Sequence, residues 1–218
     1  MSFVKTYGFP RSGSHLLMTL IGANFYPSTD LTSPGGQVGH WADRVTVPPV
    51  EYGQLAGHHG PPSWGYEKNA SVYIYRDGRA VAASLYRSPH FKHPANAATF
   101  SEFIRQPLDW QWTVGNKWPN TSNVIDHWRE HLSVWKRTDV LAVRYEDLAR
   151  YPATQISRML YVYKLDRPDE WTLPDKLVGW FPSGGKRDGW RELWNDDDEA
   201  WFYERVPREF YGVMEAPF

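Results

Sequence analysis

The sequence predicts a single α/β domain with a mostly parallel central sheet flanked by helices on both faces. Short apolar runs rich in β-prone residues alternate along the chain with segments of helical spacing. No internal repeat or linker divides the 218 residues, a length that suits one domain with a substantial core. In such a fold, ligands bind beyond the carboxyl ends of the strands.

The first predicted elements are a strand over residues 3–7, a tight turn, and a helix carrying the apolar run 16–21. The turn contains Gly13 and the small hydroxyls of Ser12 and Ser14. This order forms a phosphate cradle, because the first N–H groups of a helix are unpaired and its dipole attracts anions. Arg11 adds a cation. The turn is not a Walker A sequence, since Gly-Lys-[Ser/Thr] and the first glycine are missing, which argues against ordinary ATP chemistry. A turn that binds no ligand is the alternative.

The remaining elements alternate in the same way. The patterns predict a strand over 71–75 that ends at Arg76, a helix opened by Asp77 that runs through Leu85, a short helix near 99–105, a helix over 122–136, a strand over 140–144, a helix marked by Ile156 to Tyr163, and a last helix led by Asp196. Two segments, about 26–66 and 87–120, are predicted to be irregular apart from that short helix. Long irregular segments are usually functional or disordered, and we expect these two to cover a binding site.

Composition narrows the function classes. The net charge of -1 gives no indication of binding to nucleic acid or to a membrane surface. The absence of cysteine excludes disulfides, thiolate catalysis and cysteine-based metal sites. No basic segment followed by a long apolar run opens the chain, and no run is long enough to span a membrane. We therefore expect a soluble, cytoplasmic protein.

Four motifs follow one another along the chain. The first is the loop Tyr7–His15, and the second is Tyr75-Arg76, with Ser84 eight residues after Arg76. The third combines Trp118, His127 and Trp128 with the later segment Val143–Leu148, and the fourth is the loop Lys186–Arg191. In this order they resemble motifs of the sulfotransferases that use 3'-phosphoadenosine 5'-phosphosulfate (PAPS). The first resembles that family's P-loop-like phosphosulfate loop, and the second its 3'-phosphate strand and helix. The third resembles its Tyr-Glu-Asp-Leu segment, and the fourth its closing loop.

The resemblance implies which residues bind the nucleotide. They are Arg11, Ser12, Gly13, Ser14, His15, Arg76, Ser84, Tyr145, Lys186 and Arg187. An arginine fork suits a phosphate, and a serine hydroxyl adds one hydrogen bond, so Arg76 and Ser84 would form a second phosphate site distant from the Arg11 loop. Alternatively, Arg76 pairs with Asp77 or Glu146, and Ser84 faces solvent.

The aromatic and basic parts of the nucleotide site depart from the family pattern. Tyr145 either lies against the adenine, as the resemblance implies, or packs behind the sheet. Leu16 stands where relatives carry a tryptophan over the adenine. Lys186 and Arg187 would close over the 3'-phosphate, although Asp188 follows them where a glycine or apolar residue is expected.

The candidate general base lies in the segment 56–62, Ala-Gly-His-His-Gly-Pro-Pro. It resembles the family's Lys-Thr-His-x-Pro, and the proline places His59 at the catalytic histidine, with Gly57 in place of the lysine. A histidine near neutral pKa suits removal of a proton from an acceptor. His58 is the alternative, and the glutamates Glu51 and Glu67 stay open. No third ligand at a recognised spacing joins the two histidines, so no metal is expected.

The resemblance as a whole implies transfer of a sulfuryl group from PAPS to an acceptor hydroxyl or amine, with adenosine 3',5'-bisphosphate (PAP) as the product. Arg11 would stabilise charge on the leaving phosphate, because arginine stays protonated. The acceptor would be a small molecule or a carbohydrate, and its identity and the oligomeric state stay open. Two other functions are weighed: a P-loop small-molecule kinase that needs magnesium, and a non-catalytic nucleotide- or carbohydrate-binding module.

Overall fold

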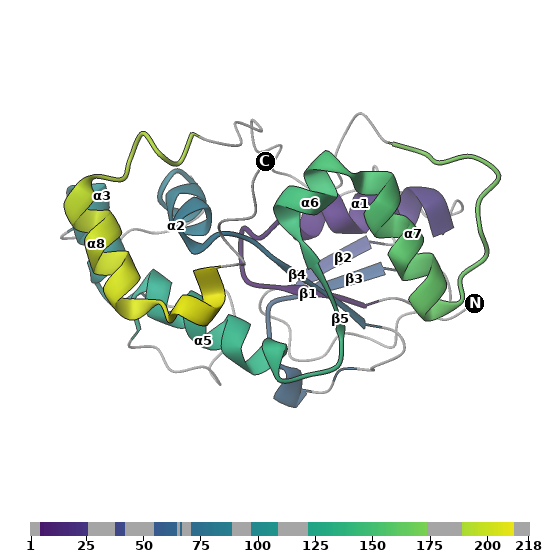
Figure 1. Ribbon diagram of the computed structural model, residues 1–218, viewed down its shortest axis with the longest axis horizontal. Helices are drawn as coiled ribbons and strands as arrows, with labels where there is room; N and C mark the ends of the chain where they lie inside the picture. Colours follow the sequence, from purple (N-terminus) through teal and green to yellow (C-terminus); the bar gives the residue numbers. More distant parts are fainter. Residues whose placement is uncertain are drawn as a thin grey trace.

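The computed structural model describes residues 5–25, 38–41, 55–64, 66, 71–88, 97–108, 122–173 and 189–211, with the backbone alone for 38–41, 55–58 and 64. Five parallel strands form one sheet in the order β2-β3-β1-β4-β5 (Figure 1). The strands are β1 (Lys5–Gly8), β2 (Val38–Trp41), β3 (Leu55–His58), β4 (Ser71–Tyr75) and β5 (Leu141–Arg144). The central strand is therefore β1, which leads directly into the first loop.

Helices pack on both faces of this sheet, as the sequence predicts. They are α1 (Ser14–Phe25), α2 (Gly78–Tyr86), α3 (Phe100–Arg105), α5 (Val124–Lys136), α6 (Tyr145–Arg150), α7 (Pro152–Tyr163) and α8 (Asp196–Arg205), with 3-10 turns η1 (Pro62–Trp64) and η3 (Arg208–Phe210). Alternate residues of β4 face opposite cores, because side chains alternate along a strand. Val72 and Ile74 pack with α1 and α7, whereas Tyr73 packs with α2 and α5.

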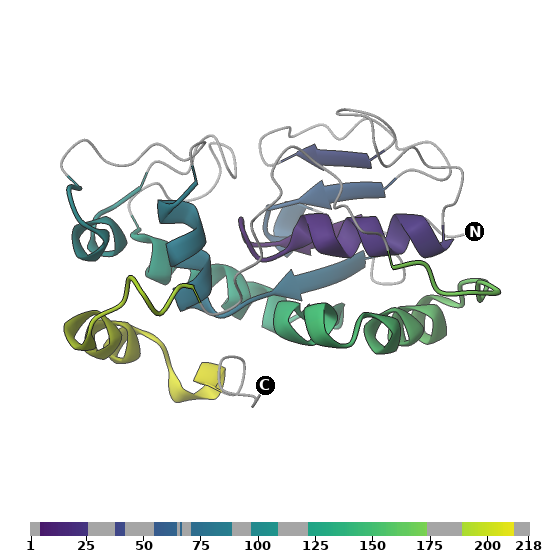
Figure 2. The ribbon, with the colours of Figure 1, turned by 90° about the horizontal axis from the view of Figure 1, so that it is seen from above.

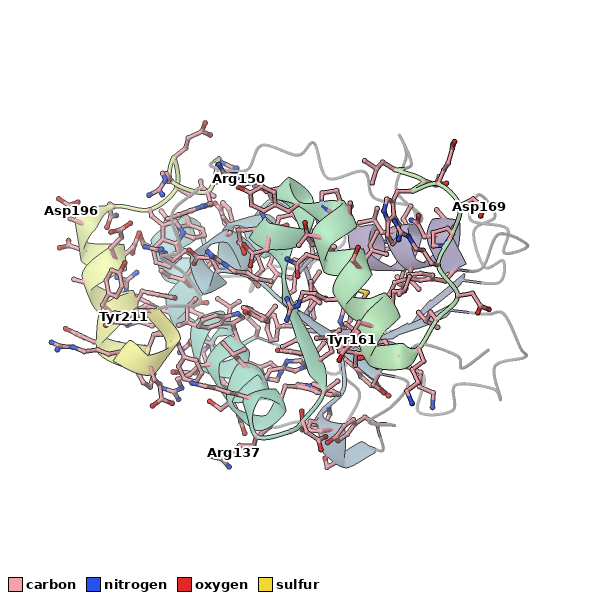
Figure 3. The ribbon with its side chains drawn as sticks, turned by 45° about the vertical axis from the view of Figure 1, so that its right-hand side comes forward. Arg137, Arg150, Tyr161, Asp169, Asp196 and Tyr211 are labelled. Carbon is pink, nitrogen blue, oxygen red and sulfur yellow. The ribbon has the colours of Figure 1, made fainter. Side chains whose placement is uncertain are left out.

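The carboxyl ends of the strands point toward the group formed by α2, α3 and α8 (Figure 2). Asp196 of α8 and Asp169, which follows α7, mark opposite ends of the molecule (Figure 3). The core that contains Tyr73 extends from the sheet to α8 and includes Trp128, Trp194 and Phe202. Aromatic side chains therefore connect the sheet to the helices beyond its carboxyl edge.

Side-chain caps fix where several helices begin. Asp77 accepts a hydrogen bond from the N–H of Arg79 at the start of α2, and Asn123 accepts two at the start of α5. Thr99 and Glu102 form a capping box on α3, and Asn195 caps α8. Each cap satisfies N–H groups that the helix itself leaves unpaired. The cap of α2 matters most here, because it directly follows Arg76.

The structure differs from the sequence prediction in segment 26–66, which we expected to be irregular. Two strands, β2 and β3, lie within it. Their sequences, Val-Gly-His-Trp and Leu-Ala-Gly-His, show no apolar period, and both strands form through pairing with neighbouring strands. A separate helix, α6, also follows β5, where the sequence predicted no helix. Within the described ranges, no helix has the length and apolar character to cross a membrane.

Candidate active site

The loop between β1 and α1 has the geometry expected of a phosphate cradle. The N–H of Ser12 donates to the carbonyl of Phe9 over 3.1 Å, and that of Leu17 donates to the carbonyl of Gly13 over 3.1 Å. Arg11 and Gly13 have positive φ angles of 69° and 100°. Only glycine adopts such angles without strain, so Arg11 is held in an uncommon conformation. The turn directs the N-terminus of α1 to the carboxyl edge of the sheet.

Two serine hydroxyls in this loop have no hydrogen-bond partner within the part of the chain that the structure describes. The side chains of Ser12 and Ser14 are buried. Among the described residues, neither Oγ atom has a hydrogen-bond partner. Buried hydroxyls are almost always satisfied in folded proteins, so an unsatisfied pair beside a helix N-terminus indicates that a ligand with acceptor oxygens binds here.

Tyr145 closes one side of the loop. A Cβ atom on Gly13 would lie 2.3 Å from Cδ2 of the Tyr145 ring. The same ring lies under the guanidinium of Arg76, whose Cζ is 4.3 Å from the ring centroid. Tyr145, the first residue of α6, therefore contacts both the loop and Arg76, and it also packs against the core that contains α1 and α7.

Arg11, Arg76 and Ser84 form one cluster. Nε of Arg11 donates to Oγ of Ser84 over 3.0 Å, and Nη1 of Arg76 donates to the carbonyl oxygen of Arg11 over 3.3 Å. The sequence predicted that Arg76 and Ser84 lie at a distance from the Arg11 loop. That expectation is wrong for this structure, because β1 and β4 are adjacent and their carboxyl ends meet.

The alternative roles weighed for these two residues also differ from what the structure shows. Asp77 pairs with Arg79 over 2.8 Å, and Glu146 pairs with Arg144 over 3.1 Å. Within the described part of the chain, no carboxylate forms an ion pair with Arg76 or Arg11. The hydroxyl of Ser84 accepts a hydrogen bond from Arg11, so it does not face solvent without a partner.

The electrostatics of the cluster favour an anion. Burial, and secondarily the neighbouring charge of Arg76, lower the pKa of Arg11. Nε of Arg76 is also buried and has no hydrogen-bond partner among the described residues. Glu146, close by, has a pKa raised mainly by burial and opposed by Arg144 and Arg76. Two partly desolvated guanidinium groups that no described carboxylate bridges are stabilised when anions bind beside them.

His59 lies next to the loop because of strand register. Tyr7 of β1 is paired with His58 of β3, so the residues that follow, Gly8 and His59, are neighbours. The buried ring of His59 places Nδ1 2.5 Å from the carbonyl oxygen of Gly8. A carbonyl only accepts hydrogen bonds, so Nδ1 is the ring nitrogen that donates in this contact.

Other predicted site residues are placed in part. His15 is the second residue of α1 and is half-buried. Lys186 and Arg187 lie outside the described residues, as do Glu51 and Glu67, and so does the side chain of His58. No group of three or more potential metal ligands occurs within the described ranges.

Three residues of α5 that were not predicted to belong to the site support it, although Trp128 stands in one of the four motifs. Nε1 of Trp128 donates to the carbonyl of Arg76 over 3.1 Å, and the Trp128 ring packs against Gly78. On the same helix, His131 and Trp135 contact the segment that contains His59. Their spacing indicated only a buried helix face. The histidine at 131 was the available signal, because a buried imidazole needs polar partners.

Comparisons with known proteins bear on the family and the fold of this chain. Residues 55–172 match the model of the sulfotransferase domain family. Mouse sulfotransferase SULT7A1 complexed with PAP has a similar structure, with a TM-score of 0.58 and 15% identity over 99% of this chain and 86% of that one. Retinol dehydratase in complex with androsterone and inactive cofactor PAP has a TM-score of 0.56 and 16% identity, over 99% of this chain and 81% of that one. The complex of retinol dehydratase with retinol and PAP has a TM-score of 0.55 and 14% identity, over 99% of this chain and 82% of that one. No curated protein sequence matches the chain significantly. The likeness to these solved structures confirms the predicted fold.

Proposed function

This chain belongs to the sulfotransferase domain family, and from that premise we propose that it moves a sulfuryl group from PAPS to an acceptor hydroxyl or amine. The observation that supports this proposal best is the cluster of unsatisfied anion-binding groups at the carboxyl edge. Ser12 and Ser14 offer buried hydroxyls, and Arg11 and Arg76 offer guanidinium groups with no ion-pair partner among the described residues. These groups fit the phosphate and sulfate oxygens of the donor.

Each residue of this cluster is assigned a role in holding the nucleotide. Ser12, Gly13, Ser14 and His15 would bind the 5'-phosphosulfate through the N-terminus of α1. Arg76 would bind the 3'-phosphate. Ser84 would add a hydrogen bond to the 3'-phosphate once Arg11, which donates to its hydroxyl in this structure, contacts the bound donor instead. When bound, the donor supplies the sulfuryl group and a phosphate leaving group.

Tyr145 would hold the loop and border the adenine, given its contacts with Gly13 and Arg76. Lys186 and Arg187 would close over the 3'-phosphate, as the resemblance implies. We assign the whole chain, residues 1–218, to one catalytic domain, with acceptor-covering parts in segments 26–66 and 87–120.

His59 would act as the general base. Its Nδ1–H donates to the carbonyl of Gly8, which fixes the orientation of the ring, and Nε2 of the neutral ring would take the acceptor proton. A positioned base accelerates proton transfer by about 10²–10⁴-fold. Arg11 would stabilise the negative charge that develops on the leaving phosphate, and it does not release a proton itself because its guanidinium remains protonated. A metal is not part of this proposal.

A substitution at His59 separates catalysis from folding. His59→Asn keeps an N–H donor near the position of Nδ1 but has no basic nitrogen. We expect this variant to bind PAP as tightly as the wild type, and to transfer sulfuryl groups at least about 100-fold more slowly. Calorimetric titration with PAP and single-turnover transfer from ³⁵S-labelled PAPS measure the two quantities. Unchanged transfer in the variant would remove His59 from the mechanism and leave His58 or a glutamate as the base.

The acceptor is best sought among small hydroxylated or amine-bearing molecules and carbohydrates. One structural neighbour was solved with androsterone and with retinol, which makes hydroxylated apolar compounds the first group to assay. Labelled PAPS is incubated with the panel, with and without EDTA. Transfer that is insensitive to EDTA supports the proposal. PAP binding without transfer to any acceptor class would favour the non-catalytic module, and magnesium-dependent phosphoryl transfer from ATP would favour a kinase.

A further inference from the structure

Two side chains of α5 donate hydrogen bonds to consecutive carbonyl groups of the segment that follows β3. Nε2 of His131 lies 3.1 Å from the carbonyl oxygen of His59, and Nε1 of Trp135 donates to the carbonyl oxygen of Gly60 over 3.2 Å. Residues 131 and 135 are one helical turn apart and share one face of the helix. Both are buried, and so is His59.

A third side chain fixes the protonation of this arrangement. The hydroxyl of Tyr73, in β4, lies 3.0 Å from Nδ1 of His131. Because the carbonyl of His59 can only accept, Nε2 of His131 carries the proton, and Nδ1 of the neutral ring must accept from the Tyr73 hydroxyl. Burial raises the pKa of Tyr73 well above its usual value, so this hydroxyl stays protonated. The ring of Tyr73 also stacks on Trp135, with centroids 5.0 Å apart.

The chain of hydrogen bonds ends on a backbone oxygen and not on the His59 ring. It therefore carries no proton to or from the base. What it fixes is the position of the His59 backbone, while the carbonyl of Gly8 fixes the ring from the other side. The segment beyond β3 runs into Pro61 and Pro62, which have no N–H groups, so it cannot extend the strand pairing.

We propose that His131, with Trp135 and Tyr73, is a positioning residue that holds His59 in register with the phosphate loop. This inference rests on the proposed function only for the role given to His59. Strand pairing sets where His59 lies along the sheet, and the hydrogen bonds from α5 set how closely the His59 backbone lies to that helix. Displacement of a catalytic group by about 1 Å is enough to cost on the order of 100-fold in rate.

Three variants test the inference. His131→Gln places an amide N–H near the position of Nε2 and keeps a donor for the His59 carbonyl, whereas His131→Leu has none. Tyr73→Phe removes the hydroxyl that fixes the His131 tautomer. His127→Gln is the matched control, because His127 is buried on the same helix and its ring faces Phe9. Folded fractions are compared by circular dichroism, and rates are given per folded enzyme.

We expect His131→Leu to lower kcat by about tenfold or more while the KM for PAPS and the PAP affinity change less than about twofold. His131→Gln should recover most of kcat, and Tyr73→Phe should fall between the two. The control His127→Gln should keep the wild-type kcat. Equal kcat per folded molecule in wild type and His131→Leu would overturn the inference and leave His131 a purely structural residue.

A measurement without turnover separates this inference from the proposed function. In ¹⁵N-histidine NMR of the full chain, the wild-type His59 ring should show one tautomer, protonated at Nδ1. Its signals are identified by their loss in His59→Asn. In His131→Leu we expect a mixture of tautomers, and in His131→Gln the wild-type pattern. If wild-type enzyme transfers no sulfuryl group, the proposed function fails while this result still decides the positioning role. An unchanged spectrum in His131→Leu contradicts it.

Discussion

Arg11 occupies a backbone conformation that most side chains avoid, with a φ of 69°. Holding a non-glycine residue there costs on the order of 1–2 kcal/mol. The conformation is supported from two directions, since Ser84 accepts from its guanidinium and Arg76 donates to its carbonyl. The loop therefore places a cation at the carboxyl edge at the expense of local backbone strain. Backbone geometry is correspondingly restrictive at the neighbouring Gly13.

Gly13→Ala is expected to damage the loop for two separable reasons. The residue has a φ of 100°, and an added Cβ would lie 2.3 Å from the Tyr145 ring. We expect a loss of at least about 2 kcal/mol in unfolding free energy, together with loss of PAP binding. Urea unfolding and calorimetric titration measure the two effects.

The double variant Gly13→Ala with Tyr145→Ala separates the causes. It removes the steric clash but keeps the strained φ. Compared with Tyr145→Ala alone, the cost of Gly13→Ala should shrink to the backbone term, about 1 kcal/mol. An identical cost of Gly13→Ala in both backgrounds would show that the ring contact contributes nothing.

His127 gives the molecule a defined pH dependence. Burial lowers the pKa of His127 from 6.5 to about 3 in the folded state. In the unfolded chain the pKa stays near the ordinary value, so below it the unfolded state binds a proton that the folded state does not. Stability contributed by neutral His127 is therefore present above pH 6.5 and lost as pH falls toward the folded pKa.

Comparison with His127→Gln measures this effect. Between about pH 7.5 and about pH 5, wild type should lose about 2 kcal/mol more unfolding free energy than the variant, since each pH unit below the unfolded pKa contributes about 1.4 kcal/mol. Urea titrations at the two pH values give the difference. Equal losses in the two proteins would mean that His127 is charged in the folded state.

At the scale of elements, the start of α2 connects stability to the site. Asp77 caps this helix and pairs with the buried Arg79, whose guanidinium also stacks on Trp190 and donates to the hydroxyl of Tyr203. Hydrogen bonding with Asp77 and its charge raise the pKa of Arg79 against the opposing effect of burial. The element that begins next to Arg76 is thus attached to the C-terminal segment.

Asp77→Ala should therefore destabilise the protein by about 3 kcal/mol or more, because it leaves a buried guanidinium without its carboxylate and removes a cap. Asp77→Asn keeps the capping oxygen and should cost less. We also expect weaker PAP binding in Asp77→Ala, since Arg76 directly precedes the cap. Unfolding titrations and calorimetry measure both.

The control is Asn195→Ala, which removes the cap of α8 far from the loop. It should cost about 1 kcal/mol of stability and leave PAP affinity unchanged. If Asp77→Ala binds PAP as tightly as wild type, the cap of α2 does not position Arg76.

At the scale of the whole molecule, the nucleotide should stabilise the fold, because only the folded chain brings β1, β4 and α1 together. At about 100 times its Kd, PAP should add about 2.7 kcal/mol. For a protein of this size that corresponds to a rise in Tm of roughly 5–10 °C. Thermal unfolding followed by circular dichroism measures the shift.

Matched arginine variants make the thermal shift specific. Arg76→Met should lose most of the stabilisation, whereas Arg87→Met, which removes an exposed arginine paired with Glu192, should keep it. EDTA should change neither result, and ATP should give a smaller shift than PAP. An equal shift with ATP would contradict the assignment of Arg76 to a second phosphate.

Local sequence patterns determined the parts of this protein that depend on neighbouring residues. The loop from Gly8 to Ser14, the strand that ends at Arg76 and the helix of residues 124–136 were all predictable, because apolar periodicity and turn chemistry are local. The fold class followed from their alternation, and the resemblance of four motifs followed from their order.

Only the tertiary structure decided which of these residues meet. The pairing of β1 with both β3 and β4 brings His59 to Gly8 and Arg76 to Arg11, and no local pattern encodes that register. The short strands β2 and β3 form because neighbouring strands satisfy their backbone groups. That pairing is not visible in the sequence, which shows no apolar period there. The same holds for His131, whose partner is a carbonyl group 72 residues away in the chain.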